Sequence, residues 1–227
     1  MKKQEVRGLI EQIGIVPVIR ASSPQEARFA AEAVCQGGIP IVEITMTVPK
    51  ALEVISELVK TAPDVVVGAG TVLNEEIARK CADAGAQFLV SPGFNAPTVA
   101  VAQTLDLIIM AGALTPTEVM TAWDSGADFV KVFPCGNLGG ANYIRALKGP
   151  LPEVPLVPTG GVNLDTAADY IRAGAAALGV GGELMPKEAL QLRQAEVIRT
   201  LAARFRELVK GARVPMTAKT ERAAETR

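Results

Sequence analysis

The sequence predicts an α/β protein, a closed (β/α)8 barrel of the TIM type with an extra N-terminal helix. Three observations favour this fold class. Eight short apolar, β-branched runs alternate with longer segments in which apolar residues recur three and four positions apart. Glycines recur at the ends of helical segments. The 227 residues are enough for eight such units in one barrel.

Strands and helices are expected to alternate along the chain, so that neighbouring strands pair in parallel through right-handed crossovers. The expected strands are Ile15–Ile19, Ile41–Thr45, Val65–Ala69, Phe88–Val90, Leu107–Met110, Phe129–Phe133, Leu156–Pro158 and Ala177–Val180. Segments of helical period between them include Pro24–Gln36, Pro49–Thr61, Asn74–Ala84 and Pro116–Ser125.

Four glycines mark the even-numbered strands. Gly38, Gly85, Gly126 and Gly174 each lie between a helical segment and the next strand, where a glycine accepts the left-handed conformation that ends a helix. Their spacings of 47, 41 and 48 residues each correspond to two β/α units. A quarter-barrel repeat explains this pattern.

The two ends of the chain complete the expected fold. Lys3–Gln12 has helical period and is expected to cover the bottom of the barrel, and Glu188–Lys210 is the last helical region. We expect one domain over residues 1–211, followed by a flexible, polar tail at 212–227.

Composition excludes several function classes. The net charge of −1, from 23 basic and 24 acidic residues, gives no basic surface for a nucleic acid. No segment is apolar enough to span a membrane and the N-terminus lacks a signal peptide, so a cytoplasmic protein with reduced cysteines is expected. The chain has no histidine, which disfavours metal sites and leaves carboxylates, lysine or hydroxyls for catalysis.

Two charged residues lie inside expected strands. Lys131 alternates with Val130 and Val132, and Glu43 alternates with Val42 and Ile44. The valines suit contacts with surrounding helices, so Lys131 and Glu43 should point into the barrel, from strands on opposite sides of the ring. A desolvated lysine favours its neutral, nucleophilic form, whereas the structural alternative is a buried ion pair. Whether a ligand-sized space separates the two side chains distinguishes these interpretations.

The expected mouth of the barrel carries groups that suit an anionic ligand. Arg20, which ends the first strand, can hold a carboxylate, and Thr71 offers a hydroxyl after the third strand. Glycine turns at Thr159-Gly160-Gly161 and Gly181-Gly182 follow the last two strands, the usual phosphate site of such barrels. Simple tight turns are the alternative. No dinucleotide or phosphate-loop lysine motif is complete, so no cofactor is expected.

Together these motifs resemble the family of 2-keto-3-deoxy-6-phosphogluconate (KDPG) aldolase and 4-hydroxy-2-oxoglutarate (KHG) aldolase. The resemblance runs from about residue 5 to about residue 210. It rests on Val18–Ala21, Val42–Thr45, Val67–Val72, Val90–Gly93, Phe129–Pro134 and Pro158–Val162. It implies a trimeric, metal-independent lyase of the Entner–Doudoroff pathway that splits a 2-keto-3-deoxy sugar acid phosphate into pyruvate and glyceraldehyde 3-phosphate.

The resemblance also implies roles for matching positions. Lys131 would form an imine with the substrate, Glu43 would move protons, and Arg20 and Thr71 would hold the pyruvate end. The other implied binding residues line the pocket or hold the phosphate: Pro92, Phe133, Thr159, Gly160, Gly161, Gly181 and Gly182.

This chain departs from the family pattern at two positions. Thr47 stands where some members bind the substrate carboxylate with an arginine, and Arg20 is the expected substitute. Gly182 stands where many members have a serine in the last phosphate loop, which keeps backbone donors but removes a hydroxyl.

Other functions fit parts of this pattern. An aldolase for the galactonate epimer would use the same residues, and a phosphosugar isomerase or epimerase would use the same barrel without needing Lys131. A non-enzymatic sensor of phosphorylated ligands, or an assembly subunit, would need neither Lys131 nor Glu43.

Overall fold

The computed structural model describes residues 1–213 and shows the expected barrel of parallel strands. The pairing order is β7-β6-β5-β4-β3-β2-β1-β8. The ring closes between β7 and β8 through a bridge from Thr159 to Gly179 and a 2.9 Å hydrogen bond from the Ala176 amide to the Leu156 carbonyl. The strands are β1 Ile15–Ile19, β2 Ile41–Thr45, β3 Val66–Gly70, β4 Phe88–Val90, β5 Ile108–Ala113, β6 Phe129–Val132, β7 Leu156–Pro158 and β8 Leu178–Val180.

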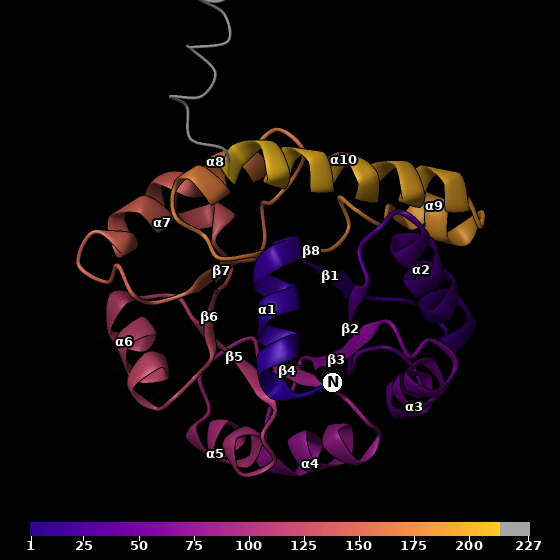
Figure 1. Ribbon diagram of the computed structural model, residues 1–227, viewed down its shortest axis with the longest axis horizontal. Helices are drawn as coiled ribbons and strands as arrows, with labels where there is room; N and C mark the ends of the chain where they lie inside the picture. Colours follow the sequence, from indigo (N-terminus) through magenta and orange to yellow (C-terminus); the bar gives the residue numbers. More distant parts are fainter. Residues whose placement is uncertain (214–227) are drawn as a thin grey trace, which may run out of the picture.

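Helices α2 to α10 lie around these strands, and α1 lies across the centre of the ring (Figure 1). Their bounds are α1 Lys3–Ile13, α2 Pro24–Gln36, α3 Ala51–Thr61, α4 Glu75–Asp83, α5 Ala96–Thr104, α6 Pro116–Asp124, the 3-10 helix η1 Gly136–Leu138, α7 Ala141–Lys148, α8 Ala167–Arg172, α9 Lys187–Gln191 and α10 Ala195–Arg213. None of the helices within residues 1–213 is long and apolar enough to cross a membrane.

The four repeated glycines adopt the backbone conformation that the sequence predicts. Gly38, Gly85, Gly126 and Gly174 have φ between +87° and +101°. Each lies in the connection between a helix and the even-numbered strand that follows it. Any residue with a Cβ atom would be strained in this conformation. This requirement explains why a glycine recurs once in every two β/α units.

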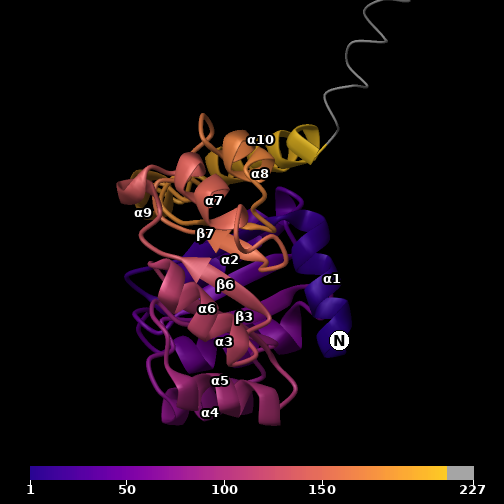
Figure 2. The ribbon, with the colours of Figure 1, turned by 90° about the vertical axis from the view of Figure 1, so that its left-hand side faces the viewer.

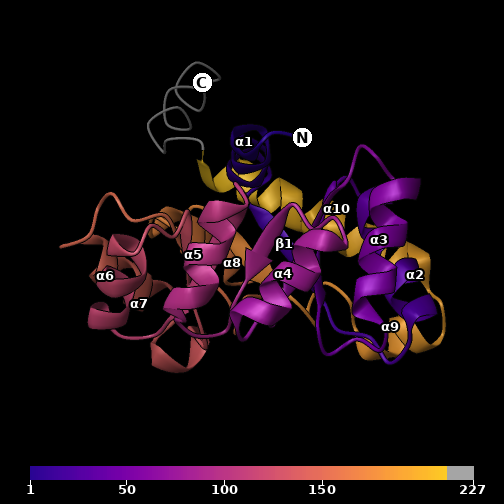
Figure 3. The ribbon, with the colours of Figure 1, turned by 90° about the horizontal axis from the view of Figure 1, so that it is seen from below.

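Helix α1 covers the N-terminal end of the barrel, as predicted. Lys3 forms a 2.9 Å ion pair with Asp128 just before β6, and the Arg7 guanidinium lies 5.4 Å from the centre of the Phe129 ring. In Figure 1 α1 lies across the centre of the ring, and Figures 2 and 3 show α1 on one side of the barrel with α9 toward the opposite side. The bottom of the barrel is therefore closed, and ligands must enter from the C-terminal ends of the strands.

The last helical region is divided, whereas the sequence suggested one region over Glu188–Lys210. Helix α9 ends at Gln191 and α10 begins at Ala195, because Arg193 adopts a left-handed conformation with φ of 54°. The Arg193 guanidinium donates to the Gln25 carbonyl at 3.0 Å. Helix α10 extends through Arg213, past the expected tail boundary at 212, and the rest of that expected tail, 214–227, lies outside the described residues.

Candidate active site

Lys131 and Glu43 are both buried inside the barrel. Lys131 lies on β6 with 4% of its surface exposed, and Glu43 lies on β2 with 2% exposed. The strand order places β2 and β6 on opposite sides of the ring. The positive charge of Lys131 acts to lower the pKa of the Glu43 carboxyl group. This arrangement agrees with the alternation of residues in the two strands.

The Glu43 carboxylate is an unusual buried group because it lacks a partner. Burial raises the pKa of Glu43, while the positive charges of Lys131 and Arg20 oppose that rise. Its Oε1 atom is buried and makes no hydrogen bond, and within residues 1–213 no ion pair within 4.0 Å joins it to Lys131. The structure therefore disagrees with a simple buried ion pair. A proton-accepting group without a partner is suited to work on a bound molecule.

The Lys131 amine is similarly free to react. Its Nζ atom lies 5.4 Å from the centre of the Phe133 ring, and in the described part of the chain it forms no hydrogen bond or ion pair. A buried amine without a hydrogen-bonding partner is suited to attack a carbonyl carbon. Neither Lys131 nor Glu43 lines the cavities described below.

Gly70, the last residue of β3, makes room for the Glu43 carboxylate. A Cβ atom at Gly70 would lie 1.9 Å from Glu43 Oε1 and 2.6 Å from its Cδ, so a larger residue must displace that carboxylate. This role of Gly70 is not evident from the sequence. The only signal was a glycine at the C-terminal end of an interior strand.

We expect Gly70→Ala to lower kcat by about 100-fold, because a displacement of about 1 Å at a reacting group has effects of that size. The change in melting temperature should be small, since the end of the Glu43 side chain can move. Steady-state kinetics and thermal melts would measure both effects. Gly8→Ala in α1 is the control, because its added Cβ meets no atom within 4 Å. Unchanged kcat in Gly70→Ala would show that the position of the Glu43 carboxylate is not critical.

Thr71 and Pro92 lie on the rim next to this centre. Thr71 follows β3 and has φ of 59°, which is strained for a β-branched residue and is typical of functional positions. The backbone of Pro92 packs closely on Gly112 of β5, where a Cβ atom would lie 2.2 Å from the Pro92 carbonyl carbon. Neither residue lines the cavities described below, so their contact with a ligand remains a sequence-based expectation.

The other expected binding residues meet in one cavity of about 150 Å³ at the mouth. Gly160 and Gly161 have φ of 83° and 78°, and within the described residues the amides of Gly160, Gly161, Gly181 and Gly182 donate no hydrogen bond. Four free amides in one cavity can hold an anion. Of the expected residues, those that line it are Arg20, Phe133, Thr159, Gly160, Gly161, Gly181 and Gly182; Val18, Val162, Gly179 and Glu183 complete the wall.

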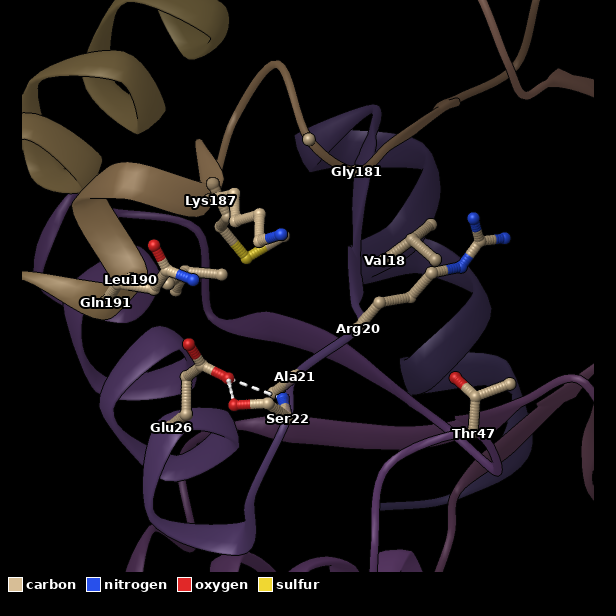
Figure 4. A pocket seen from close by; sticks show the side chains of 12 residues that line it. Val18, Arg20, Ala21, Ser22, Glu26, Thr47, Gly181, Lys187, Leu190 and Gln191 are labelled. Carbon is tan, nitrogen blue, oxygen red and sulfur yellow. Dashed lines mark hydrogen bonds between the residues drawn. The ribbon is translucent and has the colours of Figure 1, made fainter.

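A second cavity of about 470 Å³ adjoins the first at Val18, Arg20, Gly181 and Gly182. Figure 4 shows its side chains. Glu26 accepts hydrogen bonds from the amide and hydroxyl of Ser22, and these bonds lower the pKa of Glu26. Arg20 extends away from this pair. The Glu26 carboxylate is thus occupied by its hydrogen bonds to Ser22. Arg20 is the positively charged residue that lines both cavities.

Sequence reasoning missed several residues of the mouth. Lys187 and Gln191 line the larger cavity, and Glu183 lines the smaller one. Thr47, already noted as a departure from the family pattern, also lines the larger cavity. Glu183 directly follows the Gly181-Gly182 turn, which was a usable signal. Lys187 and Gln191 lie on a short helix whose orientation the sequence does not reveal. No group of three or more potential metal ligands occurs within residues 1–213.

Comparison with known proteins gives one consistent result. Residues 6–201 match the family described as KDPG and KHG aldolase. The KHG/KDPG aldolase of Escherichia coli K12 is 35% identical over 201 residues, covering 88% of this chain and 92% of that protein. The 2-dehydro-3-deoxy-phosphogluconate aldolase of Treponema pallidum is 38% identical over 176 residues, covering 78% and 83%.

A solved structure agrees with these relatives. It is the KDPG aldolase of Legionella pneumophila with pyruvate captured at low pH as a covalent carbinolamine intermediate. It aligns with a TM-score of 0.81 and 29% identity, covering 87% of this chain and 96% of that one.

Proposed function

The chain belongs to the KDPG and KHG aldolase family, and from this premise we propose that it is a Schiff-base aldolase. It cleaves 2-keto-3-deoxy-6-phosphogluconate to pyruvate and glyceraldehyde 3-phosphate, and 4-hydroxy-2-oxoglutarate to pyruvate and glyoxylate. The observation that carries this proposal is that Lys131 and Glu43 are buried on opposite strands of the barrel and that, among residues 1–213, neither side chain forms a hydrogen bond or an ion pair.

Lys131 supplies the electron sink for this reaction. Its neutral amine adds to the C2 ketone to give a carbinolamine, which loses water to form a protonated imine. When the C3–C4 bond breaks, its electron pair moves into the imine and gives a neutral enamine. Within residues 1–213 the amine makes no hydrogen bond or ion pair that would have to be broken before it reacts.

Glu43 moves the protons. Its carboxylate takes the proton of the C4 hydroxyl, so that C4 leaves as an aldehyde, and then returns a proton to C3 of the enamine. Water hydrolyses the resulting pyruvate imine and frees Lys131. With no histidine in the chain, Glu43 is the buried group placed to do this.

Arg20 holds the substrate carboxylate, with Thr71 beside it and Pro92 and Phe133 as walls of the pocket. Arg20 lies where both mouth cavities meet, and its charge acts on Glu43. Arg20 can therefore act on the catalytic residues and also contact a ligand in the cavities. The phosphate lies against Thr159, Gly160, Gly161, Gly181 and Gly182. Within the described residues the amides of these four glycines donate no hydrogen bond, and all five residues line the smaller cavity.

We expect Arg20→Met to raise KM about 30-fold, because it removes a charge-assisted contact worth about 2 kcal/mol. It also removes one of the charges that keep the pKa of Glu43 down, so the acidic limb of the kcat profile should move to higher pH. Steady-state kinetics between pH 5 and 9 would measure both. Arg28→Met is a suitable control, because Arg28 pairs with Glu57 on the outer surface. An unchanged KM would remove Arg20 from the binding site.

A substrate panel with borohydride trapping tests the proposed function. Pyruvate release from KDPG, its galactonate epimer and 4-hydroxy-2-oxoglutarate would rank the substrates, and reduction in the presence of pyruvate should leave an adduct on Lys131. Isomerase activity without an adduct would favour the isomerase or epimerase. Binding of sugar phosphates without pyruvate release would favour a sensor.

We also propose that the protein acts as a cytoplasmic homotrimer, as the family resemblance implies. Family membership supports the assembly. Light scattering during size-exclusion chromatography would determine the number of subunits, and cell fractionation would determine the compartment.

A further inference from the structure

One acidic side chain stands in the cavity that is expected to receive a phosphate. Glu183 lines the 150 Å³ cavity together with the glycine turns. It is exposed, and within residues 1–213 it forms no ion pair or hydrogen bond. A negative charge without a neutralising partner among the described residues thus belongs to the wall of this cavity.

Two cations lie near Glu183, and neither forms an ion pair with it within residues 1–213. Arg20 lines the same cavity but also borders the larger one, and the proposed mechanism assigns it to the substrate carboxylate. Lys187 lines only the larger cavity, on the other side of Gly181 and Gly182. A group at the far end of the substrate thus meets free amides and one carboxylate.

These two kinds of group favour different ligands. Backbone amides donate to any oxygen acceptor, including a phosphate or a hydroxyl. A carboxylate accepts a hydrogen bond from a hydroxyl, but it repels a phosphate dianion. The combination of amides with Glu183 is suited to a chain that ends in a hydroxyl group.

We propose that Glu183 is a specificity-determining residue that admits 2-keto-3-deoxy sugar acids without a phosphate and weakens the binding of phosphorylated ones. This inference rests on the proposed aldolase function. The reacting end of the substrate is the same in both classes, so Glu183 changes the preference at the far end and leaves the chemistry on Lys131 unaltered.

The test compares kcat/KM for KDPG and for 2-keto-3-deoxygluconate, which lacks the phosphate. Glu183→Gln should raise the ratio of phosphorylated to unphosphorylated substrate about tenfold, equivalent to about 1.4 kcal/mol. Glu183→Ser, which also adds a small hydroxyl donor, should raise it at least as much. An unchanged or lower ratio in Glu183→Gln would overturn the proposal.

Two controls separate a charge effect from a structural one. Glu188→Gln makes the same charge change on α9 outside both cavities and should alter the ratio less than twofold. Raising the salt from about 0.1 to about 1 M shortens the Debye length from about 10 to about 3 Å, so the difference between Glu183→Gln and the unaltered protein should shrink. A salt-independent difference would contradict repulsion by Glu183.

Failure of this inference differs from failure of the aldolase function. If no 2-keto-3-deoxy acid releases pyruvate and borohydride traps no adduct, the aldolase function is wrong. If turnover and trapping are normal in every variant but the substrate ratio does not respond to Glu183, only the inference is wrong.

Discussion

Lys131→Met is expected to abolish pyruvate release while leaving the fold intact. Without the amine no imine forms, and the electrons of the C3–C4 bond have no acceptor. The loss should reach at least about 10⁵-fold, since enzymes accelerate such reactions by about a million-fold or more and the covalent intermediate is the basis of this one.

The folded state should tolerate this substitution. Lys131 is buried with no hydrogen bond or ion pair in the described residues, so its side chain contributes packing at the cost of a desolvated amine. Methionine fills a similar volume without that cost. The melting temperature of Lys131→Met should therefore equal or exceed that of the unaltered protein.

Pyruvate release, borohydride trapping followed by peptide mass spectrometry, and thermal melts measure these outcomes. Lys80→Met is a suitable control, because Lys80 is exposed on α4 and forms an ion pair with Glu76 on the same helix. Turnover that survives in Lys131→Met, or an adduct on a different lysine, would exclude the proposed mechanism.

The position of Lys131 could be predicted from sequence because strand geometry is local. Side chains alternate between the two faces of a strand, so valines on one face place Lys131 and Glu43 on the other. The order of the strands then sets these residues across from each other. The same local logic predicted the left-handed glycines before even-numbered strands, which the structure confirms.

What could not be predicted depends on contacts between distant segments. The fit of Gly70 against the Glu43 carboxylate requires the register of β2 with β3. Glu183 lines the same cavity as both glycine turns, and predicting this would require knowing how the loops after β7 and β8 are placed. The break at Arg193 depends on its contact with Gln25 in α2. No periodicity within one segment encodes such contacts.

Glu43→Gln is expected to lower kcat about 1,000-fold while leaving imine formation nearly normal. A carboxamide cannot accept the C4 hydroxyl proton, and positioned general bases contribute about 10² to 10⁴-fold. Borohydride trapping with pyruvate should proceed at a rate within a few fold of normal. If trapping and turnover fell equally, Glu43 would act by tuning the Lys131 amine instead.

The pH dependence of stability provides a second readout of Glu43→Gln. Burial raises the pKa of Glu43 in the folded protein, so the folded state binds this proton more tightly than the unfolded chain does. Stability is therefore lost as the pH rises from the unfolded pKa of about 4.3 through the raised folded pKa. Glutamine cannot ionise, so the variant avoids this loss.

The stability of Glu43→Gln relative to the unaltered protein should thus increase with pH over that window and level off above it. Urea unfolding from pH 4 to pH 8 would measure this difference, with Glu75→Gln on the exposed start of α4 as the control. A stability difference that stays constant with pH would mean that the Glu43 carboxyl titrates alike in both states. In that case burial would not raise the pKa of Glu43, and the proposed role of Glu43 as the proton-transferring group would not be supported.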